Sequence, residues 1–239
     1  MKTYIKIILL ALLTPLLSVA ASAYEVDGIT LTPIEHATMV IQTKDSTIYV
    51  DPVGDMKLFQ KFPPPDIILL TDIHRDHLSI ETVNSLKKNL TTVIGPPEAV
   101  ASLQHGEVMK NGDKKTFGNI SMEAVPMYNL TEERLNFHPK GRGNGYVLTI
   151  NKKRIYISGD TEDIAEMRSL KNIDYAFICM NLPYTMTVDQ AASAVLEFTP
   201  KVVIPYHYRG KGMISDLQRF KRLVSKNDDI DVKLLDWYQ

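Results

Sequence analysis

A short apolar run that ends in a dense group of histidines and aspartates constrains this chain most. Residues 67–70 read Ile-Ile-Leu-Leu, and four side chains that commonly bind metals lie in the following loop, Asp72, His74, Asp76 and His77. A buried strand that stops at such a loop places these side chains at the edge of a sheet. Imidazoles and carboxylates bind divalent transition metals, whereas structural zinc sites rely on cysteine. The pattern therefore indicates a metal site that serves chemistry.

The first 23 residues have the pattern of an export signal. Lys2 and Lys6 flank the start of an apolar stretch over residues 7–17, and Ala21-Ser22-Ala23 is a cleavage site of the A-x-A type. The apolar stretch is shorter than the roughly 20 residues that span a bilayer, so we expect no stable membrane anchor; an uncleaved anchor is the alternative. We predict a periplasmic or secreted protein in which residues 24–239 form a single domain.

Charge and cysteine content exclude several classes of protein. The formal net charge of −1 becomes −3 when the two lysines of the export signal are removed, which argues against nucleic acid as a partner. Cys179 is the only cysteine, so no intrachain disulfide can form. Its apolar neighbours indicate a buried, unreactive thiol. We therefore expect a small-molecule substrate and a domain that is stabilised by its core.

Hydrophobic periodicity predicts an α/β protein. The expected strands are residues 38–42 and 47–50 as a hairpin, then 66–70, 93–94, 116–125, 145–150, 154–157, 202–205 and 232–235. The expected helices are residues 80–89 with Ser79 as N-cap, 98–104, a helix opened by the capping box Thr187-Val188-Asp189-Gln190, and 213–224. Two strand-rich segments, each followed by helices, indicate two sheets packed face to face with helices outside. This is a four-layer α/β/β/α sandwich.

Further residues of the ligand type lie at or near the ends of other predicted strands. They are Asp51, His138, Asp160 and His207. Strand ends that share one edge of a sheet bring residues distant in sequence together. We therefore expect these four residues to converge on the opening cluster.

The order of these motifs resembles the metallo-β-lactamase superfamily, whose opening motif is His-x-His-x-Asp-His. Here the chain has Asp-x-His-x-Asp-His over residues 72–77, then His138, Ser158-Gly159-Asp160-Thr161 and Pro205-Tyr206-His207. It looks most similar to stand-alone hydrolases that resemble ascorbate-phosphate lactonase and the phospholipase D-type N-acylethanolamine enzymes. The segments 36–41 and 48–52 fit that branch. The resemblance covers essentially all of residues 24–239.

The resemblance implies a metal-dependent hydrolase. In such an enzyme a metal-bound hydroxide attacks the substrate, which we expect to be an ester, a lactone or a phosphodiester rather than a β-lactam. Carried over by position, Asp72, His74 and His138 would hold a first metal, Asp76, His77 and His207 a second, and Asp160 would bridge them, with Asp76, His77 and Asp160 as catalytic residues and Asp51 orienting a ligand imidazole. We expect one or two divalent ions per chain, zinc first, with manganese or iron as alternatives.

The chain departs from the superfamily pattern at two positions. Asp72 stands where the family has histidine, and an anionic oxygen ligand favours a harder metal such as manganese or iron(II). A carboxylate that supports a ligand or caps a helix is the alternative for Asp72. His138 comes nine residues after Asn129, where many relatives place their third histidine, so a loop has to bring it back. Its alternative is a substrate-binding or structural histidine.

Three polar residues near His138 are candidates for substrate binding. Lys140, Arg142 and Asn144 lie in a segment interrupted by glycines, and two cations suit a carboxylate or a phosphate. The alternative is an ordinary surface loop with solvated charges.

Three aromatic residues complete the candidate list. Tyr206 and Tyr208 flank His207, and one of the two is a candidate hydrogen-bond donor to a developing oxyanion. His36 lies on a predicted strand and is a candidate for the pocket lining, with a structural role as the alternative. A metal-dependent binding or sensing protein without turnover is the second hypothesis for function, and Asp72 is the feature in its favour.

Overall fold

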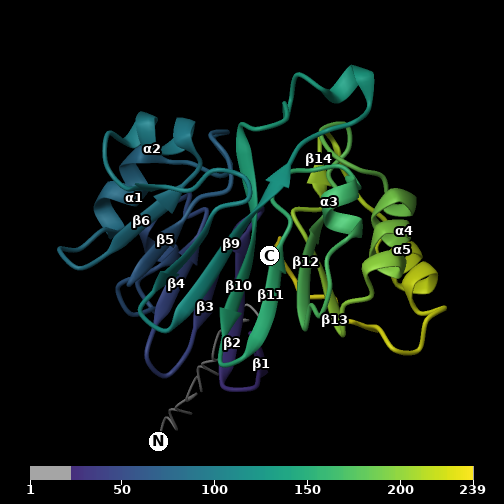
Figure 1. Cartoon of the computed structure of the whole chain (residues 1–239), viewed down its shortest axis with the longest axis horizontal. Coiled ribbons are helices and arrows are strands. Elements are labelled where there is room, and N and C mark those ends of the chain that lie inside the picture. Colours follow the sequence, from purple (N-terminus) through teal and green to yellow (C-terminus); the bar gives the residue numbers. More distant parts are fainter. Residues whose placement is uncertain (1–22, 239) are drawn as a thin grey trace, which may run out of the picture.

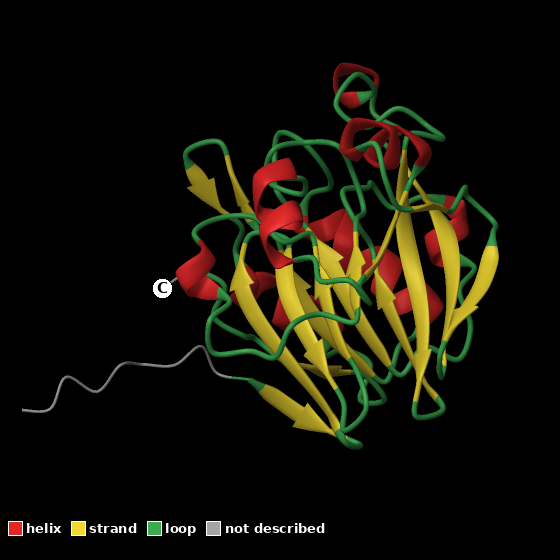
Figure 2. Ribbon diagram, turned by 90° about the vertical axis from the view of Figure 1, so that its left-hand side faces the viewer, coloured by secondary structure: helices red, strands yellow, loops and turns green. Residues whose placement is uncertain are grey.

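Two seven-stranded sheets pack face to face, with helices on both outer faces (Figure 1). The computed structural model describes residues 23–238, so the predicted export signal lies outside the described residues except for Ala23. Figure 2 shows the same arrangement turned by 90°, with the strands in yellow and the helices in red. Within the described part of the chain, no helix has the length and apolarity that crossing a membrane requires.

The strands follow a nearly sequential order in both sheets. The first sheet runs β1 (Tyr24–Val26), β2 (Ile29–Glu35), β3 (Thr38–Gln42), β4 (Thr47–Val50), β5 (Ile67–Leu69), β6 (Thr92–Gly95) and β7 (Glu107–Val108). The second runs β16 (Asp231–Val232), β13 (Val202–Tyr206), β12 (Tyr175–Cys179), β11 (Lys153–Ile157), β10 (Gly143–Ile150), β9 (Ile120–Met127) and β8 (Lys114–Phe117). A separate pair consists of β14 (Arg209–Gly210) and β15 (Met213–Ile214).

The helices lie outside the sheets. They are α1 (Ile80–Leu86), α2 (Pro97–Leu103), α3 (Ala165–Arg168), α4 (Val188–Phe198) and α5 (Leu217–Val224), with two 3-10 turns, η1 (Met56–Leu58) and η2 (Glu132–Arg134). Figure 1 shows α1 and α2 beside the first sheet, and α3, α4 and α5 beside the second. Ser79 caps α1 as predicted, and Thr187 and Gln190 form the predicted capping box of α4.

Alternation along the strands explains the layers. In β3, Met39 and Ile41 belong to the core cluster between the sheets, whereas Val40 belongs to a second cluster beneath α1 and α2. Successive residues of a strand point to opposite faces, so a strand that is apolar at every position needs cover on both sides. The central strand β12 is likewise buried at every position. These doubly covered strands produce the four-layer sandwich that the sequence predicts.

Parallel pairing brings the functional residues to one edge. Strands β4, β5 and β6 run parallel in the first sheet, and β11, β12 and β13 run parallel in the second. Asp51 follows β4, the loop that starts at Thr71 follows β5, and Asp160 and His207 follow β11 and β13. The two sheets are joined at this edge, because the Asn144 backbone N–H donates to the Thr71 carbonyl at 2.9 Å.

Four predicted elements are wrong in their extent. The helix over residues 80–89 ends at Leu86, and the strand over residues 232–235 is the short β16. The single strand over residues 116–125 is a hairpin, because Gly118 has φ +59° and turns β8 back into β9 with Phe117 opposite Ile120. The helix over residues 213–224 begins only at Leu217, since Asp216 is its N-cap and accepts a hydrogen bond from the Arg219 N–H at 2.8 Å. The preceding Met213–Ile214 forms β15 instead.

Candidate metal centre

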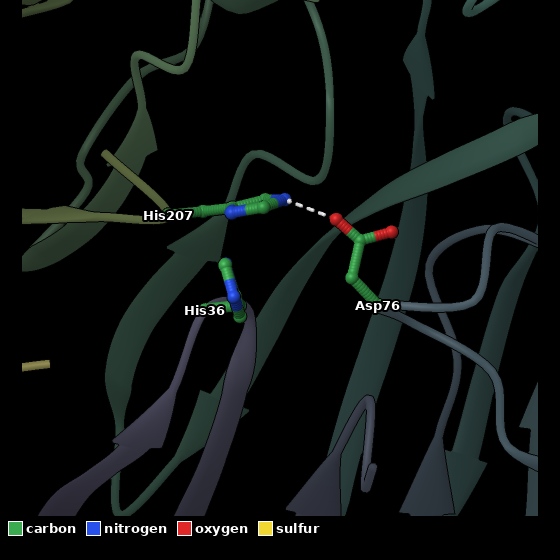
Figure 3. Close-up of side chains that lie close together, drawn as sticks. All are labelled: His36, Asp76 and His207. Carbon is green, nitrogen blue, oxygen red and sulfur yellow. Dashed lines mark ion pairs between the residues drawn. The ribbon is translucent and has the colours of Figure 1, made fainter. Parts of the chain in front are cut away.

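Two histidines and two aspartates form a cluster at the shared edge of the sheets. His77 Nε2 lies 3.4 Å from Asp160 Oδ2, and His207 Nε2 lies 3.4 Å from Asp160 Oδ1. His207 Nε2 also lies 3.2 Å from Asp76 Oδ2. Figure 3 marks this ion pair with a dashed line. His77, Asp160 and His207 are buried and offer ligand atoms that all lie within 4.8 Å of one another. We call His77, Asp160, His207 and Asp76 the inner group.

A second group lies on the other side of Asp160. Asp72, His74 and His138 also offer ligand atoms within 4.8 Å of one another. His74 Nδ1 lies 2.8 Å from Asp72 Oδ2, and His138 Nε2 lies 3.9 Å from the same oxygen. His138 Nε2 is closer to Asp160 Oδ2, at 3.3 Å. We call Asp72, His74 and His138 the outer group. Asp160 contacts His77 and His207 of the inner group as well as His138 of the outer group, which is the position expected of a bridging carboxylate.

Asp51 fixes the orientation of His77. Its carboxylate is buried and lies 2.8 Å from His77 Nδ1, and it accepts hydrogen bonds from the Thr71 N–H at 2.7 Å and the Thr71 hydroxyl at 2.5 Å. A proton on Nδ1 that is donated to Asp51 leaves Nε2 of His77 unprotonated and directed at Asp160. Histidines that bind metals commonly donate their other ring nitrogen to a carboxylate in this way.

Replacing Asp51 with asparagine is expected to weaken metal binding by roughly 10–100-fold, the usual cost of losing such an outer partner. The amide keeps the size of the side chain but removes the charge that holds the His77 tautomer. Titration of the metal-free protein with Zn²⁺ measures the change. Asp66→Asn is the control, because Asp66 accepts the Thr47 N–H at 2.8 Å at the opposite end of β5. Equal affinities for Asp51→Asn and the wild type would contradict this role.

Three residues at this edge have left-handed backbone conformations. His36 has φ +49°, Asp51 φ +42° and His207 φ +45°, which is uncommon for residues other than glycine. The Asp51 conformation is held by the Thr38 hydroxyl, which donates to the Asp51 carbonyl at 2.6 Å. Backbone strain of this kind persists where the surroundings fix it and gathers at functional sites.

Charge dominates the inner group. Burial alone would lower the pKa of both imidazoles, but Asp160 and Asp51 raise the pKa of His77 well above its usual value, and Asp160 and Asp76 raise that of His207 to about 9. Burial alone would raise the pKa of Asp160, yet the neighbouring imidazoles hold it well below its usual range. The group therefore attracts positive charge, either as protons on the imidazoles or as a metal ion that displaces them.

Asn181 and Tyr184 support the site, although the sequence did not predict a role for them. Asn181 follows β12 and directs its amide at His207 Nε2, 3.2 Å away, and at Asp160 Oδ2, 3.5 Å away. His138 Nδ1 lies 3.2 Å from the Tyr184 carbonyl, which leaves its Nε2 facing Asp160. A polar residue directly after the apolar run over residues 175–180 was the signal available for Asn181.

The loop that returns His138 to the site is organised by a buried carboxylate. Glu162 accepts the N–H groups of Leu130 and Thr131 at 2.6 Å each, and Arg134 Nη1 at 2.6 Å. This explains how a histidine so far beyond Asn129 reaches the cluster.

Most of the candidate substrate-binding residues have structural partners. The Lys140 ammonium contacts the Tyr128 hydroxyl and Glu166, and the buried Asn144 amide donates to the Met109 carbonyl at 2.7 Å. Tyr206 packs in the core, and the Tyr208 hydroxyl lies 3.4 Å from the Leu235 carbonyl. None of these four is among the described residues that line the cleft at the site.

Arg142 and His36 do reach the cluster, in different ways. Arg142 contacts Asp72 and His74 rather than open solvent. The His36 ring packs edge-on against His207, with centroids 5.5 Å apart, and the two histidines form a third compact group with Asp76 (Figure 3). His36 Nδ1 lies 3.3 Å from the Tyr238 hydroxyl, so the end of the chain contacts the site.

A cleft of about 300 Å³ opens onto both groups. Its lining consists of His74, Arg75, Asp76, Phe137, His138, Asp160, Asn181 and Tyr184. The Phe137 and Tyr184 rings meet edge to face at 5.1 Å and give the cleft one apolar wall. A small molecule that enters here meets the ligand atoms directly.

The buried polar atoms of the site fit a divalent cation. His77 Nε2, His138 Nε2 and Asp160 Oδ1 are buried and have no hydrogen-bond partner among the described residues. Leaving such atoms unpaired is costly, and all three belong to residues around Asp160. Two nitrogens and a carboxylate oxygen are the donor set that zinc and neighbouring transition metals accept.

Comparison with known proteins identifies the family. A model of the beta-lactamase superfamily domain matches residues 30–207. The chain belongs to the metallo-β-lactamase superfamily. The match spans the segment from β2 to His207 and so includes both ligand groups.

Similar proteins also support the assignment of this chain to the metallo-β-lactamase superfamily. A UPF0173 metal-dependent hydrolase of Ligilactobacillus salivarius is 34% identical over 184 residues, which cover 72% of this chain and 82% of the relative. A crystal structure from Parabacteroides distasonis is 39% identical with a TM-score of 0.83, covering 92% of this chain and 99% of that one. The metallo hydrolase Igni18 of Ignicoccus hospitalis, 21% identical with a TM-score of 0.74 over 88% of this chain and 96% of its own, shares the fold. These comparisons confirm the predicted metallo-β-lactamase fold and the prediction that the chain is a metal-dependent hydrolase.

Proposed function

We propose that this metal-dependent hydrolase acts on a small ester, lactone or phosphodiester. The observation that carries the proposal is the set of unpaired buried ligand atoms around Asp160 that face a cleft of small-molecule size. His77, Asp160, His207 and Asp76 would hold the ion. A divalent ion at such a position lowers the pKa of a water and polarises a carbonyl or phosphoryl oxygen.

The side chains around the cleft suit this chemistry. The Asp76 carboxylate is 42% exposed and lines the cleft, so it can orient an attacking water by accepting a hydrogen bond from it. The apolar wall of Phe137 and Tyr184 excludes bulk water from one side. Arg75 lines the same cleft and can bind an anionic group of the substrate, such as a carboxylate or phosphate.

Chromogenic substrates test the proposed reaction. Protein loaded with Zn²⁺ or with Mn²⁺ is expected to hydrolyse at least one of a nitrophenyl phosphodiester, a nitrophenyl ester and a lactone, and not a chromogenic β-lactam. Chelation with EDTA is expected to abolish the activity, and re-addition of the metal to restore it. Metal binding without turnover of any of these classes would contradict the proposal.

That outcome would favour the second candidate, a metal-dependent binding or sensing protein. The specific observation in its favour is that Asp72 is paired with Arg142, so one of the predicted metal ligands is already engaged.

A further inference from the structure

A guanidinium group lies among the residues predicted to hold the first metal. Arg142 Nε donates to Asp72 Oδ1 at 3.1 Å, and Arg142 Nη2 donates to Asp72 Oδ2 at 2.9 Å. Both oxygens of a fully buried carboxylate are therefore engaged in a two-pronged ion pair. Such planar pairs are the strongest and most specific that arginine forms.

The same guanidinium also contacts His74. Arg142 Nη2 lies 3.3 Å from His74 Nε2, while His74 Nδ1 lies 2.8 Å from Asp72 Oδ2. Both ring nitrogens of His74 therefore have partners. Among the described residues of the site, the buried ligand-type atoms without a hydrogen-bond partner belong to His77, His138, Asp160 and His207, and none belongs to Asp72. Of the outer group, only His138 has an unpaired nitrogen to offer to a metal.

Charge balance separates the two groups further. Asp72 is paired through both of its carboxylate oxygens with the Arg142 guanidinium. Asp76 and Asp160 of the inner group have ion pairs only with histidines among the described residues. In the inner group a dication meets carboxylates that pair with no lysine or arginine among the described residues, whereas in the outer group it would compete with the fixed cation of Arg142.

The backbone holds Arg142 in this position. Gly143 follows it at the start of β10, and a Cβ atom there would lie 2.9 Å from the Thr71 carbonyl and 2.1 Å from Met127 Cε. Only glycine allows this approach of β10 to the end of β5, which places residue 142 beside residue 72. Arg142 Nη2 also donates to the Phe137 carbonyl, and the side chain is only 12% exposed. The guanidinium is thus enclosed by its own loop.

We propose that Arg142 takes the place of the first metal ion and that the chain binds a single divalent cation in the inner group. Asp72 and His74 then serve to hold Arg142 rather than a metal, and His138 supports Asp160. The inference rests on the metal dependence assumed in the proposed function but not on the substrate class. It replaces the two-metal arrangement implied by the resemblance.

Metal content tests the inference directly. Protein stripped with chelator, reloaded with excess Zn²⁺ and desalted is expected to contain one zinc per chain by elemental analysis and native mass spectrometry. Two tightly bound zinc ions per wild-type chain would overturn the single-metal proposal and leave the proposed hydrolysis intact. A chain that binds no zinc or manganese would overturn both.

Two variants distinguish Arg142 from a passive neighbour. His74→Ala is expected to retain one zinc with an unchanged dissociation constant, and loss of zinc from this variant would overturn the proposal. Arg142→Met is expected to gain a second, weaker zinc, because Asp72, His74 and His138 are then released. A folded Arg142→Met protein that still binds one zinc would count against it.

A nearby cation provides the matched control. Lys140→Gln removes a charge two residues before Arg142, where the ammonium pairs with Glu166 outside the cleft. It is expected to bind one zinc, as the wild type does. Circular dichroism checks that Arg142→Met is folded. If that variant does not fold, the zinc content of the wild type and of His74→Ala decides between the two arrangements.

Discussion

Replacing His77 or His207 with alanine is expected to remove the bound metal and with it hydrolysis. Each histidine directs Nε2 at Asp160 from a buried position, at 3.4 Å in both cases. The loss should exceed the roughly 10–100-fold that removal of an outer partner costs, because a ligand atom itself disappears. Elemental analysis and the hydrolysis assay with the best chromogenic substrate measure the two effects together.

His105→Ala is the matched control for these variants. His105 Nε2 pairs with Asn84 at 2.8 Å and belongs to none of the compact ligand groups in the described chain. It should keep the wild-type metal content and rate. A His77→Ala, His207→Ala double variant with normal metal content and turnover would show that the inner group is not the metal site.

Replacing Trp237 with alanine is expected to destabilise the fold by about 3–5 kcal/mol, the usual cost of truncating a buried large aromatic residue. Trp237 is fully buried, and its ring lies 5.5 Å from the Tyr206 ring and 6.3 Å from the Phe177 ring, centroid to centroid. The cavity would open beside the end of β13, immediately before His207. Urea unfolding followed by circular dichroism measures the change in free energy.

Leu90→Ala is the control for this prediction. Leu90 is 92% exposed, so its truncation should change the free energy of unfolding by no more than about 0.5 kcal/mol. A similar small change for Trp237→Ala would mean that the last residues of the chain do not contribute to the core. A large change would establish them as part of the layer that supports His207.

The sequence predicted the inner group because its members obey a local rule. Asp160 and His207 each follow a buried strand, and parallel pairing places such strand ends at one edge. The family resemblance implied that Asp51 orients a ligand imidazole, and in the structure its carboxylate lies 2.8 Å from His77 Nδ1. These placements need only the strand order, which hydrophobic patterns and family resemblance supply.

The role of Arg142 could not be predicted in this way. Its pairing with Asp72 depends on how closely β10 approaches β5 across the two sheets, and that distance is set by Gly143. The sequence showed only that Arg142 is a cation in a loop with glycines. Such a cation can bind an anionic group of a substrate or a carboxylate of the protein itself. The hairpin at Gly118, by contrast, could have been predicted from the sequence. Gly118-Asn119 is a two-residue turn signal inside the segment that was predicted as one strand.

The origin of the ligands has a mechanical consequence. His77 and Asp76 come from the loop after β5 in the first sheet, whereas Asp160 and His207 follow β11 and β13 in the second. An ion held by all four residues is a cross-link between the two halves of the sandwich. Cys179, as the only cysteine, cannot provide such a bond within the chain. Metal binding at this centre would therefore also hold the two sheets together and stabilise the fold.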